Sequence, residues 1–460
     1  MTLQGYIDQI KGKRIAVIGI GVSNTPLIEL LLRNGCDVTA CDKRSMEQMG
    51  ELGLRLQEQG AKLKLGEDYL EGLDQDLIFR TPGLMPFDPH LEAAREKGSQ
   101  ITSEMEVFIS LCPCKVIAVT GSDGKTTTTT IISELLKAAG YRVHVGGNIG
   151  HPLLCETPDI RSDDIVVLEL SSFQLHSMMC APNVAVITNL TPNHLDKHKD
   201  FQDYIDAKRS IYLHQGPEGR LVLNADDPHT DYYRSSAPGH VSLFSDKQQV
   251  PQGTMLQDGW LCWVTEGRVQ QILPASEIRI PGEHNVLNYL AAFEAVRGLV
   301  DAETCRQVAR DFQGVAHRLE LVRELRGVRY INDSIGSSPT RTIAGLHALK
   351  TAPIILCGGY DKHIPFDGLG EELCLHAKAV VLTGHTAEKI RDAILAAPSY
   401  ARHPVPFVMV EDFREAVLTA SKMAGEGDIV LLSPACASFD HFKNFEERGN
   451  TFKNIVMEIE

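Results

Sequence analysis

Several features are missing from this 460-residue sequence, and each absence argues against a class of protein. No stretch approaches the roughly 18 consecutive apolar residues of a membrane-spanning helix, and residues 1–10 lack the apolar core of a signal peptide. There is no basic excess: the net charge of −15 disfavours nucleic acid or an anionic membrane as a partner. The eleven cysteines include no C-x-x-C pair, which is typical of reduced thiols. We therefore expect a soluble, cytoplasmic protein.

The composition that remains is that of an ordinary globular protein, with 43% hydrophobic and 23% charged residues. Its length suits two to four domains. Apolar strand-like runs alternate with helical patterns, which predicts an α/β protein with three domains. We place these at residues 1–110 (Rossmann-like), 111–314 (central, P-loop ATPase-like) and 315–460 (Rossmann-like).

A phosphate-binding loop is predicted at residues 115–127, where a β-branched strand, a glycine turn and a helix follow one another. Such a turn aims backbone N–H groups and the positive end of a helix dipole at one point, which suits an anion. Lys125 adds a charge for the β- and γ-phosphates, and Thr126 a hydroxyl suited to Mg²⁺. The general motif has glycine where this chain has Val119. The alternative is therefore a glycine-rich turn with an incidental lysine.

Two polar residues, Glu169 and His194, follow further apolar runs of the central domain. Ligands bind outside the carboxyl ends of parallel strands, so we expect both beside Lys125. A carboxylate next to a triphosphate suits Mg²⁺. Taken singly, Glu169 is as easily a salt-bridged acid and His194 a satisfied polar residue. We discount a zinc site at His194 and His198, because no third ligand is evident.

A weak dinucleotide fingerprint opens the first domain. Asn24 replaces its third glycine, and Asp42 stands at the end of the second predicted strand. Asp42, Lys43 and Arg44 suit a sugar or uracil and a phosphate. The alternatives are an α/β domain without a nucleotide, and a dehydrogenase.

Asn285 and Asn288 lie one turn apart on a predicted helix, where they can face a purine edge. Helix capping is the alternative, since asparagine caps well. Further along the chain, polar clusters again follow the strands predicted after residue 314.

This chain resembles the Mur ligases over all three predicted domains, and eight stretches of the second and third domains carry the resemblance. They are GSDGKTT at 121–127, GGNIG at 146–150, ELSSFQL at 169–175, NLTPNHLDKH at 189–198, YIDAKRSIY at 204–212, GEHNVLN at 282–288, AHRLE at 316–320 and LLSPACASFDHFKNFEERGN at 431–450. ELSSFQL and the last stretch are most similar to the members that add D-glutamate.

The resemblance implies an ATP-driven amide synthesis in cytoplasmic peptidoglycan precursor synthesis. Its substrates would be UDP-N-acetylmuramoyl-L-alanine and D-glutamate, joined through an acyl phosphate with two Mg²⁺ ions present. It implies a monomer with no nucleic-acid or membrane partner. It also implies that the three domains bind, in order, the UDP substrate, ATP and D-glutamate.

The resemblance also implies residue roles. ATP would be held by Gly121, Ser122, Asp123, Gly124, Lys125, Thr126, Thr127, Asn285, Asn288, Arg318 and Asp333. The UDP substrate would be held by Val22, Ser23, Asp42, Lys43, Arg44, Asn148 and His194. D-Glutamate would be held by Ser337, Lys362, Ser438 and the backbone of Phe445. The metal ligands would be Thr126, Glu169, His194 and Lys208, and the catalytic residues Lys125, His194 and Lys208.

For Lys208 the resemblance implies a carbamate that binds metal. Lys208 falls on the apolar face of a helix predicted at 201–212. Burial lowers the pKa of a lysine, and a neutral amine can add CO₂. The alternative is a packed stem whose ammonium reaches water.

One loop departs from the family pattern, with Ile335 and Gly336 where lysine and alanine are common. This departure bears on the family contacts of this loop to D-glutamate and phosphate, and it leaves the family assignment unchanged. Two rival interpretations are a folylpolyglutamate synthetase, which lacks the UDP-binding first domain, and an ATP-binding regulator, which needs no cluster of Glu169, His194 and Lys208.

Overall fold

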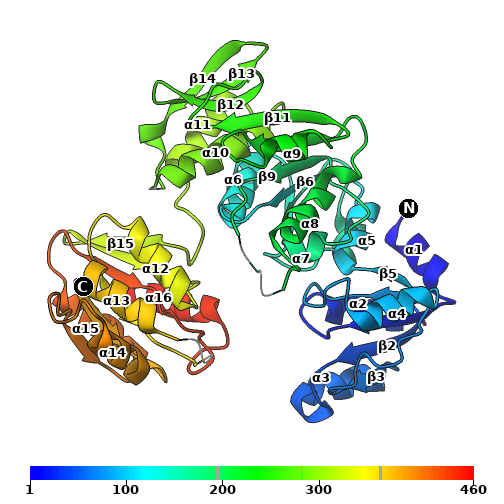
Figure 1. Cartoon of the computed structure of the whole chain (residues 1–460), viewed down its shortest axis with the longest axis horizontal. Helices are drawn as coiled ribbons and strands as arrows, with labels where there is room; N and C mark the ends of the chain where they lie inside the picture. Colours follow the sequence, from blue (N-terminus) through cyan, green and yellow to red (C-terminus); the bar gives the residue numbers. More distant parts are fainter. Residues whose placement is uncertain (193, 195–196, 281, 362–364) are drawn as a thin grey trace. The chain divides into compact units, whose positions relative to one another are not determined.

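The computed structural model describes residues 1–192, 194, 197–280, 282–361 and 365–460. By its internal contacts the chain divides into two compact units, Met1–Phe312 and Gln313–Glu460. Figure 1 shows the helices and strands of both.

The first unit begins with a five-stranded parallel sheet of order β3-β2-β1-β4-β5. Its strands are β1 (Arg14–Ile18), β2 (Asp37–Asp42), β3 (Lys62–Leu65), β4 (Leu77–Phe79) and β5 (Gln100–Thr102). Its helices are α1 (Leu3–Ile10), α2 (Asn24–Arg33), α3 (Met46–Glu58), α4 (Pro89–Glu96) and α5 (Glu104–Leu111). All residues of β1 after the first are buried, as expected for a strand covered on both faces.

A nine-stranded sheet follows in the same unit, with the order β14-β13-β12-β11-β10-β9-β6-β8-β7. Its strands are β6 (Lys115–Thr120), β7 (Val143–Gly147), β8 (Ile165–Glu169), β9 (Val184–Ile187), β10 (Arg220–Asn224), β11 (His240–Ser245), β12 (Gly253–Gln257), β13 (Trp260–Thr265) and β14 (Arg268–Pro274). Strands β6 to β12 pair with one another in parallel, whereas β13 pairs antiparallel with both β12 and β14. Strand β6 therefore lies between β8 and β9, and the carboxyl ends of all three meet at one edge.

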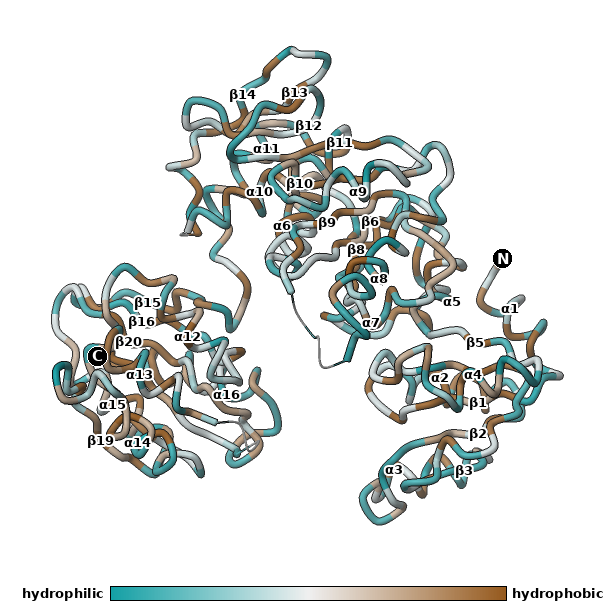
Figure 2. The backbone as a smooth tube through the Cα atoms, in the orientation of Figure 1, coloured by the Kyte–Doolittle hydropathy of each residue, from teal (hydrophilic) through white to brown (hydrophobic). Residues whose placement is uncertain are grey.

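Helices α6 and α10 lie side by side against this sheet (Figure 1). The helices of this part are α6 (Lys125–Ala138), α7 (Ser172–Leu175), α8 (Phe201–Leu213), α9 (Thr230–Arg234), α10 (Glu283–Ala295) and α11 (Ala302–Asp311), with 3₁₀ helices η1 (Leu154–Asp159) and η2 (Ala275–Glu277). Ile131 and Leu135 of α6 share one buried cluster with Tyr289 and Phe293 of α10. Figure 2 shows the central strands as hydrophobic segments.

The second unit holds a six-stranded sheet of order β15-β16-β20-β17-β18-β19, antiparallel only between β15 and β16. Its strands are β15 (Glu320–Leu325), β16 (Val328–Asn332), β17 (Ile354–Cys357), β18 (Ala379–Leu382), β19 (Phe407–Met409) and β20 (Ile429–Leu432). Its helices are α12 (Pro339–Ala348), α13 (Asp367–His376), α14 (Ala387–Ala396), α15 (Phe413–Met423) and α16 (Phe445–Glu458). Ile355 and Leu356 of β17 belong to different buried clusters, so both faces of this sheet are covered.

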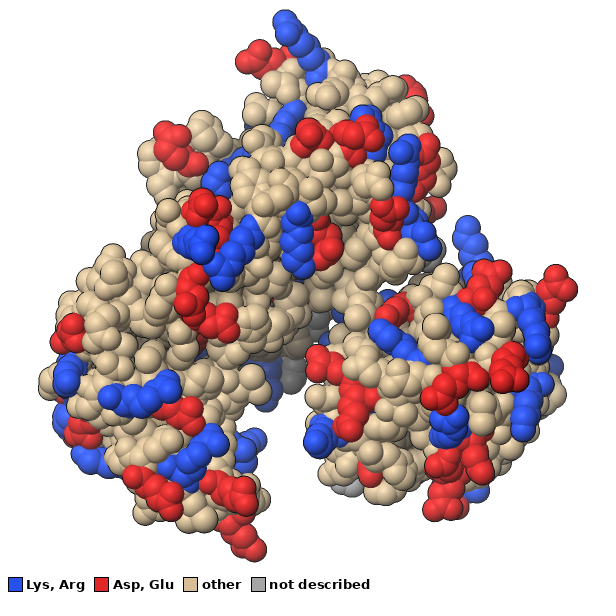
Figure 3. Space-filling model, turned by 180° about the vertical axis from the view of Figure 1, so that it is seen from behind, with Lys and Arg blue, Asp and Glu red and all other residues tan. Residues whose placement is uncertain are grey.

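The predicted α/β class is confirmed, with one sheet in each of the three predicted domains. The boundaries near residues 110 and 314 stay predictions. Among the described residues, no helix is long and apolar enough to cross a membrane. Figure 3 shows acidic and basic side chains interspersed over one face of the molecule.

Candidate functional site

The predicted phosphate loop joins β6 to α6, as the pattern indicated. Gly124 precedes the first residue of α6 with φ 76°, a left-handed conformation that favours glycine. A β-carbon at Gly124 would collide with Oδ1 of Asn288 on α10. The loop therefore needs glycine here, because the side chain of a distant helix packs directly against its backbone.

The chain after β9 fixes the loop from its other side. The backbone N–H of Ser122 donates to the carbonyl oxygen of Asn189, and that of Asp123 to its side-chain oxygen, both at 2.9 Å. The hydroxyl of Thr188 donates to the carbonyl oxygen of Asp123 at 2.6 Å. The Ser122 hydroxyl lies 2.9 Å from that of Tyr204 on α8. These contacts hold the loop in place.

Lys125 folds over this loop. Its Nζ lies 3.0 Å from the carbonyl oxygen of Gly121 and 2.7 Å from that of Ser122, and donates to both. Thr126 and Thr127 complete the first turn of α6, the former half-buried and the latter buried. An ammonium group held by carbonyl oxygens beside a helix N-terminus is suited to the phosphates of a nucleotide.

Lys208 reaches the same loop from α8. Its side chain is buried, and Nζ donates to the carbonyl oxygen of Gly121 at 2.9 Å and to the Thr120 hydroxyl at 3.3 Å. The ammonium also lies 4.5 Å from the ring centre of Tyr204. The predicted placement of Lys208 on the buried face of this helix is confirmed, and the alternative of an ammonium in water is wrong.

Burial lowers the pKa of Lys208 well below its usual value, and the positive charge of Lys125 lowers it further. The negative charges of Asp123 and Glu169 oppose this shift. The charges of Lys125 and Glu169 thus both act on the amine of Lys208, as expected if the three residues lie near one another.

Glu169 ends β8 and is buried. Its Oε1 accepts a hydrogen bond from the side-chain amide of Asn148 at 2.7 Å, whereas its Oε2 has no partner in the described part of the chain. The GGNIG turn presses against this strand, because a β-carbon at Gly147 would overlap the carbonyl oxygen of Glu169. A buried carboxylate oxygen without a donor costs free energy unless a cation satisfies it. This oxygen and the hydroxyl of Thr126 therefore fit Mg²⁺, which prefers oxygen ligands.

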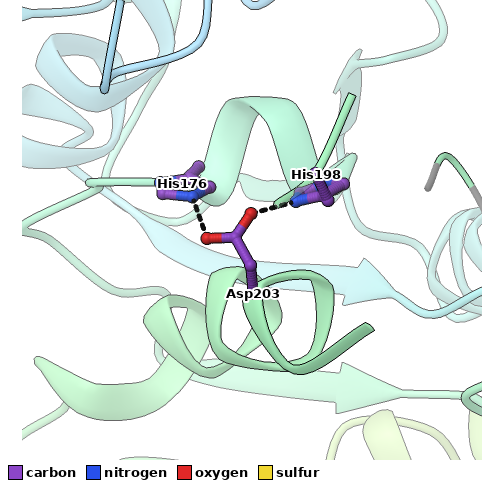
Figure 4. Close-up of side chains that lie close together, drawn as sticks. All are labelled: His176, His198 and Asp203. Carbon is purple, nitrogen blue, oxygen red and sulfur yellow. Dashed lines mark hydrogen bonds and ion pairs between the residues drawn. The ribbon is translucent and has the colours of Figure 1, made fainter. Parts of the chain in front are cut away.

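His194 is exposed and left-handed, with φ 55°, and its ring centre lies 5.0 Å from that of Phe173. His198 belongs instead to a hydrogen-bonded network with His176 and Asp203 (Figure 4). Asp203 accepts from Nε2 of His176 at 2.9 Å through one oxygen and from Nδ1 of His198 at 2.8 Å through the other. Nε2 of His198 lies 2.9 Å from the Ser172 hydroxyl. His176 and Asp203 were not predicted from the sequence, since no short spacing connects the three separate segments that meet here.

A hollow of about 320 Å³ opens between the two sheets of the first unit. Its lining includes Val22 and Ser23 from the first sheet's part and Asn148 and Phe173 from the second. Arg80 connects the same two parts, donating to the carbonyl oxygens of Phe173 and His176. Three residues predicted for a UDP group thus line one hollow together.

Asp42 is already engaged within the protein. It accepts from the backbone N–H groups of Ile20 and Arg44 at 2.8 and 2.9 Å, and from the Arg44 guanidinium at 2.9 Å. Burial would raise its pKa, but the hydrogen bonds from Arg44 and Ile20 outweigh this and lower it. Lys43 beside them is exposed.

Asn285 and Asn288 do not cap α10, because Gly282 holds the N-cap position; the capping alternative is wrong. Asn288 instead donates to Oδ1 of Asn285 at 2.9 Å and accepts from the Thr128 hydroxyl at 3.2 Å. Both asparagines thus lie on the side of α10 that faces the phosphate loop.

In the second unit, Asp333 follows β16 and is buried. It accepts from the Ser433 hydroxyl at 2.7 Å and the backbone N–H of Leu319 at 3.2 Å. Burial raises its pKa to about 6, against the opposing effect of the Ser433 hydrogen bond. Arg318 lies half-buried one residue before Leu319.

The residues predicted for D-glutamate lie around the loops of this unit. Ser438 is buried, Ser337 and Phe445 are half-buried, and the carbonyl oxygen of Phe445 accepts from the Ser334 hydroxyl at 2.7 Å. Lys362 lies outside the described residues. Arg448 was not predicted as a site residue; it is buried and donates to the carbonyl oxygens of Ser334, Cys436 and Ala437. Its position in the C-terminal family stretch was the available signal.

Comparison with known proteins yields matches over the whole chain. Residues 119–296 match the family described as the Mur ligase middle domain, and residues 317–436 the Mur ligase glutamate ligase domain. A protein of Acetivibrio thermocellus named UDP-N-acetylmuramoylalanine–D-glutamate ligase is 50% identical, over 100% of this chain and 99% of its own. One of the same name from Clostridium kluyveri is 49% identical over 98% of each chain.

Solved structures share the fold at lower identity. MurF from Acinetobacter baumannii is 19% identical, with a TM-score of 0.59 over 97% of this chain and 90% of its own. UDP-N-acetylmuramate–alanine ligase from Thermotoga maritima is also 19% identical, with a TM-score of 0.56 over 97% and 99%.

Proposed function

The chain belongs to the Mur ligase family, among its UDP-N-acetylmuramoylalanine–D-glutamate ligases, and from this premise we propose that it joins D-glutamate to UDP-N-acetylmuramoyl-L-alanine at the expense of ATP. The observation that carries the proposal is the 50% identity, over the full chain, to a relative of that name. This reaction supplies a peptidoglycan precursor, and we place it in the cytoplasm. The protein acts as a monomer without nucleic acid or membrane.

The first step is phosphoryl transfer. The γ-phosphoryl of ATP moves to the alanine carboxylate, which makes an acyl phosphate and releases ADP. Both reactants are anions, so the site must screen their charges and align them. The backbone N–H groups of residues 121–127 and the ammonium of Lys125 supply this screening. Support comes from the loop, which the contacts of Asn189 and Asn288 hold ready.

The second step is amide formation. The neutral amine of D-glutamate attacks the acyl phosphate, the tetrahedral intermediate expels phosphate, and the amine proton leaves to solvent. Water must stay out, because it would hydrolyse the acyl phosphate. Ser337, Lys362, Ser438 and the Phe445 backbone hold D-glutamate in this proposal.

Two Mg²⁺ ions would be held by Thr126, Glu169, His194 and a carbamate on Lys208, and they would neutralise charge on the phosphates. The free Oε2 of Glu169 supports this set. The lowered pKa of the buried Lys208 supports the carbamate, since a neutral amine is the form that adds CO₂. A carbamate would replace a buried cation with two anionic oxygens.

The nucleotides take the remaining sites. Val22, Ser23 and Asn148, which line the hollow, hold the UDP substrate together with Asp42, Lys43, Arg44 and His194. Asn285, Asn288, Arg318 and Asp333 hold ATP beyond its phosphates.

The deciding experiment is phosphate release from ATP with UDP-N-acetylmuramoyl-L-alanine and a panel of amino acids. We expect release with D-glutamate only, and none when either substrate is omitted. Equal turnover with meso-diaminopimelate or L-glutamate would overturn the substrate assignment. An arm with a folate and L-glutamate tests the folylpolyglutamate synthetase alternative, and turnover there would overturn the proposal.

A further inference from the structure

Three side chains converge on the surface of the second unit, outside every stretch used so far. His347 lies in the last turn of α12, and Glu372 and His376 lie in α13. Nε2 of His347 is 2.6 Å, and Nε2 of His376 3.3 Å, from the same atom, Oε2 of Glu372. One potential ligand atom from each residue lies within 4.8 Å of the other two. The two imidazole rings and the carboxylate thus converge on one point.

The fold brings these side chains together through packing beneath them. Glu372 and His376 are four residues apart, so they lie on one face of α13. Leu346, which precedes His347, is buried in the same cluster as Leu369 and Leu373 of α13. This contact fixes the end of α12 against α13 and holds the two imidazole rings 4.9 Å apart, nearly perpendicular to each other.

The cluster is open to solvent. The side chains of His347, Glu372 and His376 are 49%, 26% and 47% exposed. An ion at their focus could therefore complete its coordination with water. The group of His176, His198 and Asp203, in which His198 is buried, differs because each histidine uses a separate oxygen of Asp203 and His198 also faces Ser172 (Figure 4). Both oxygens of Asp203 and both ring nitrogens of His198 are already used there.

We propose that His347, Glu372 and His376 form a site for a borderline divalent transition metal, with Zn²⁺ as the best match. Two imidazole nitrogens, one carboxylate oxygen and water make a common tetrahedral zinc set, with bonds of about 2.0–2.2 Å. Small side-chain rotations would bring the three atoms to these distances. Mg²⁺ prefers oxygen ligands alone, so this site is chemically distinct from the one proposed at the phosphate loop.

A bound ion would also link α12 to α13. Helices α12 and α13 follow the loops after β16 and β17. An ion that binds only when both helices are folded would stabilise the second unit. We expect Zn²⁺ to raise the unfolding temperature of the full-length protein.

The test is calorimetric titration of full-length protein with Zn²⁺ in excess Mg²⁺, which occupies oxygen-only sites. The wild type is compared with the double variant His347→Ala/His376→Ala and with Glu372→Gln. His151→Ala is the matched control, because His151 is also exposed and pairs with one glutamate, Glu156, at 2.9 Å, but has no third ligand among the described residues. We expect the double variant to bind one equivalent fewer than the wild type and the control. Equal stoichiometry and affinity in all proteins would overturn the proposal.

Two measurements on the same samples keep the test decisive. With Co²⁺ in place of Zn²⁺, the wild type should show visible absorption bands of a four- or five-coordinate site that the double variant lacks. If that variant does not fold, acylation of histidines in the wild type by diethyl pyrocarbonate replaces it. Zn²⁺ should protect His347 and His376 but leave His151 reactive; no protection would overturn the site.

Discussion

The ammonium nitrogen of Lys208 lies 2.9 Å from the carbonyl oxygen of Gly121 and donates a hydrogen bond to it. A side chain from α8 thereby ends at the first residue of the phosphate loop, 87 positions earlier in the chain. The loop and this helix consequently form one site. Charge placed on the nitrogen of Lys208 acts directly on the phosphate-binding backbone.

Replacing Lys125 with alanine should abolish most activity. In the proposed mechanism the ammonium contacts the transferring phosphoryl group, and losing a charge-assisted contact in the transition state costs on the order of 3 kcal/mol, about a hundredfold in rate. Phosphate release measures this, and thermal unfolding should change little. Lys137→Ala is the control, because Lys137 lies in the last turn of the same helix, where its exposed side chain pairs with Glu134. Near-full turnover of the Lys125 variant would show that the phosphate loop was misinterpreted.

Replacing Lys208 with alanine should lose most activity and regain part of it with formate or acetate. A small carboxylate would occupy the space of the proposed carbamate and supply the oxygens proposed to bind metal. The measurement is phosphate release against carboxylate concentration, with Arg209→Ala on the same helix as a control that needs no rescue. ¹³C-bicarbonate NMR of the active wild type should give a carbamate signal. A plain amine at Lys208 in active enzyme contradicts the carbamate.

Glu104 should make the protein less stable as the pH rises from about 4.5 to 7. Burial raises its pKa to about 7, although the backbone N–H of Leu154 donates to it and opposes the shift. In this window the unfolded chain loses the proton and the folded chain keeps it, so the free energy of unfolding falls by about 3 kcal/mol in all. Below the window both states are protonated, and above it the penalty is constant.

The variant Glu104→Gln tests this, because glutamine keeps the shape and does not titrate. Denaturant unfolding should show it matching the wild type at pH 4.5 and exceeding it by about 3 kcal/mol at pH 8. Glu134→Gln is the control, because the side chain of Glu134 on α6 is 42% exposed. Parallel pH profiles of the wild type and Glu104→Gln would refute the assignment.

Replacing Asp203 with alanine should destabilise the first unit by about 2–4 kcal/mol, because two histidines lose their acceptor in a buried network. Chemical denaturation provides the measurement. Asp206→Ala is the control on the same helix: its side chain is 44% exposed and its loss should cost under about 1 kcal/mol. Equal losses for the two variants would mean that the His176–Asp203–His198 network adds no stability.

Features that depend on neighbouring residues could be predicted from the sequence. The strand, glycine turn and helix of the phosphate loop appear where local pattern predicts them, between residues 115 and 138. The apolar period of α8 also placed Lys208 on a buried face, because burial follows the helical repeat. Short edge strands such as β19, with three residues, were not predicted, since so short a run has no clear period.

Contacts between side chains that are far apart in the sequence could be seen only in the tertiary structure. Asn288 packs against Gly124, Asp203 joins His176 to His198, and Glu372 faces His347, each pair coming from separate elements. The order of strands in a sheet brings such distant segments together. For example, β6 lies between β8 and β9, although β7 is its neighbour in sequence. The periodicity of apolar residues predicts which face of a helix or strand is buried. Which residues pack against that face depends on how all the helices and strands of the chain are arranged.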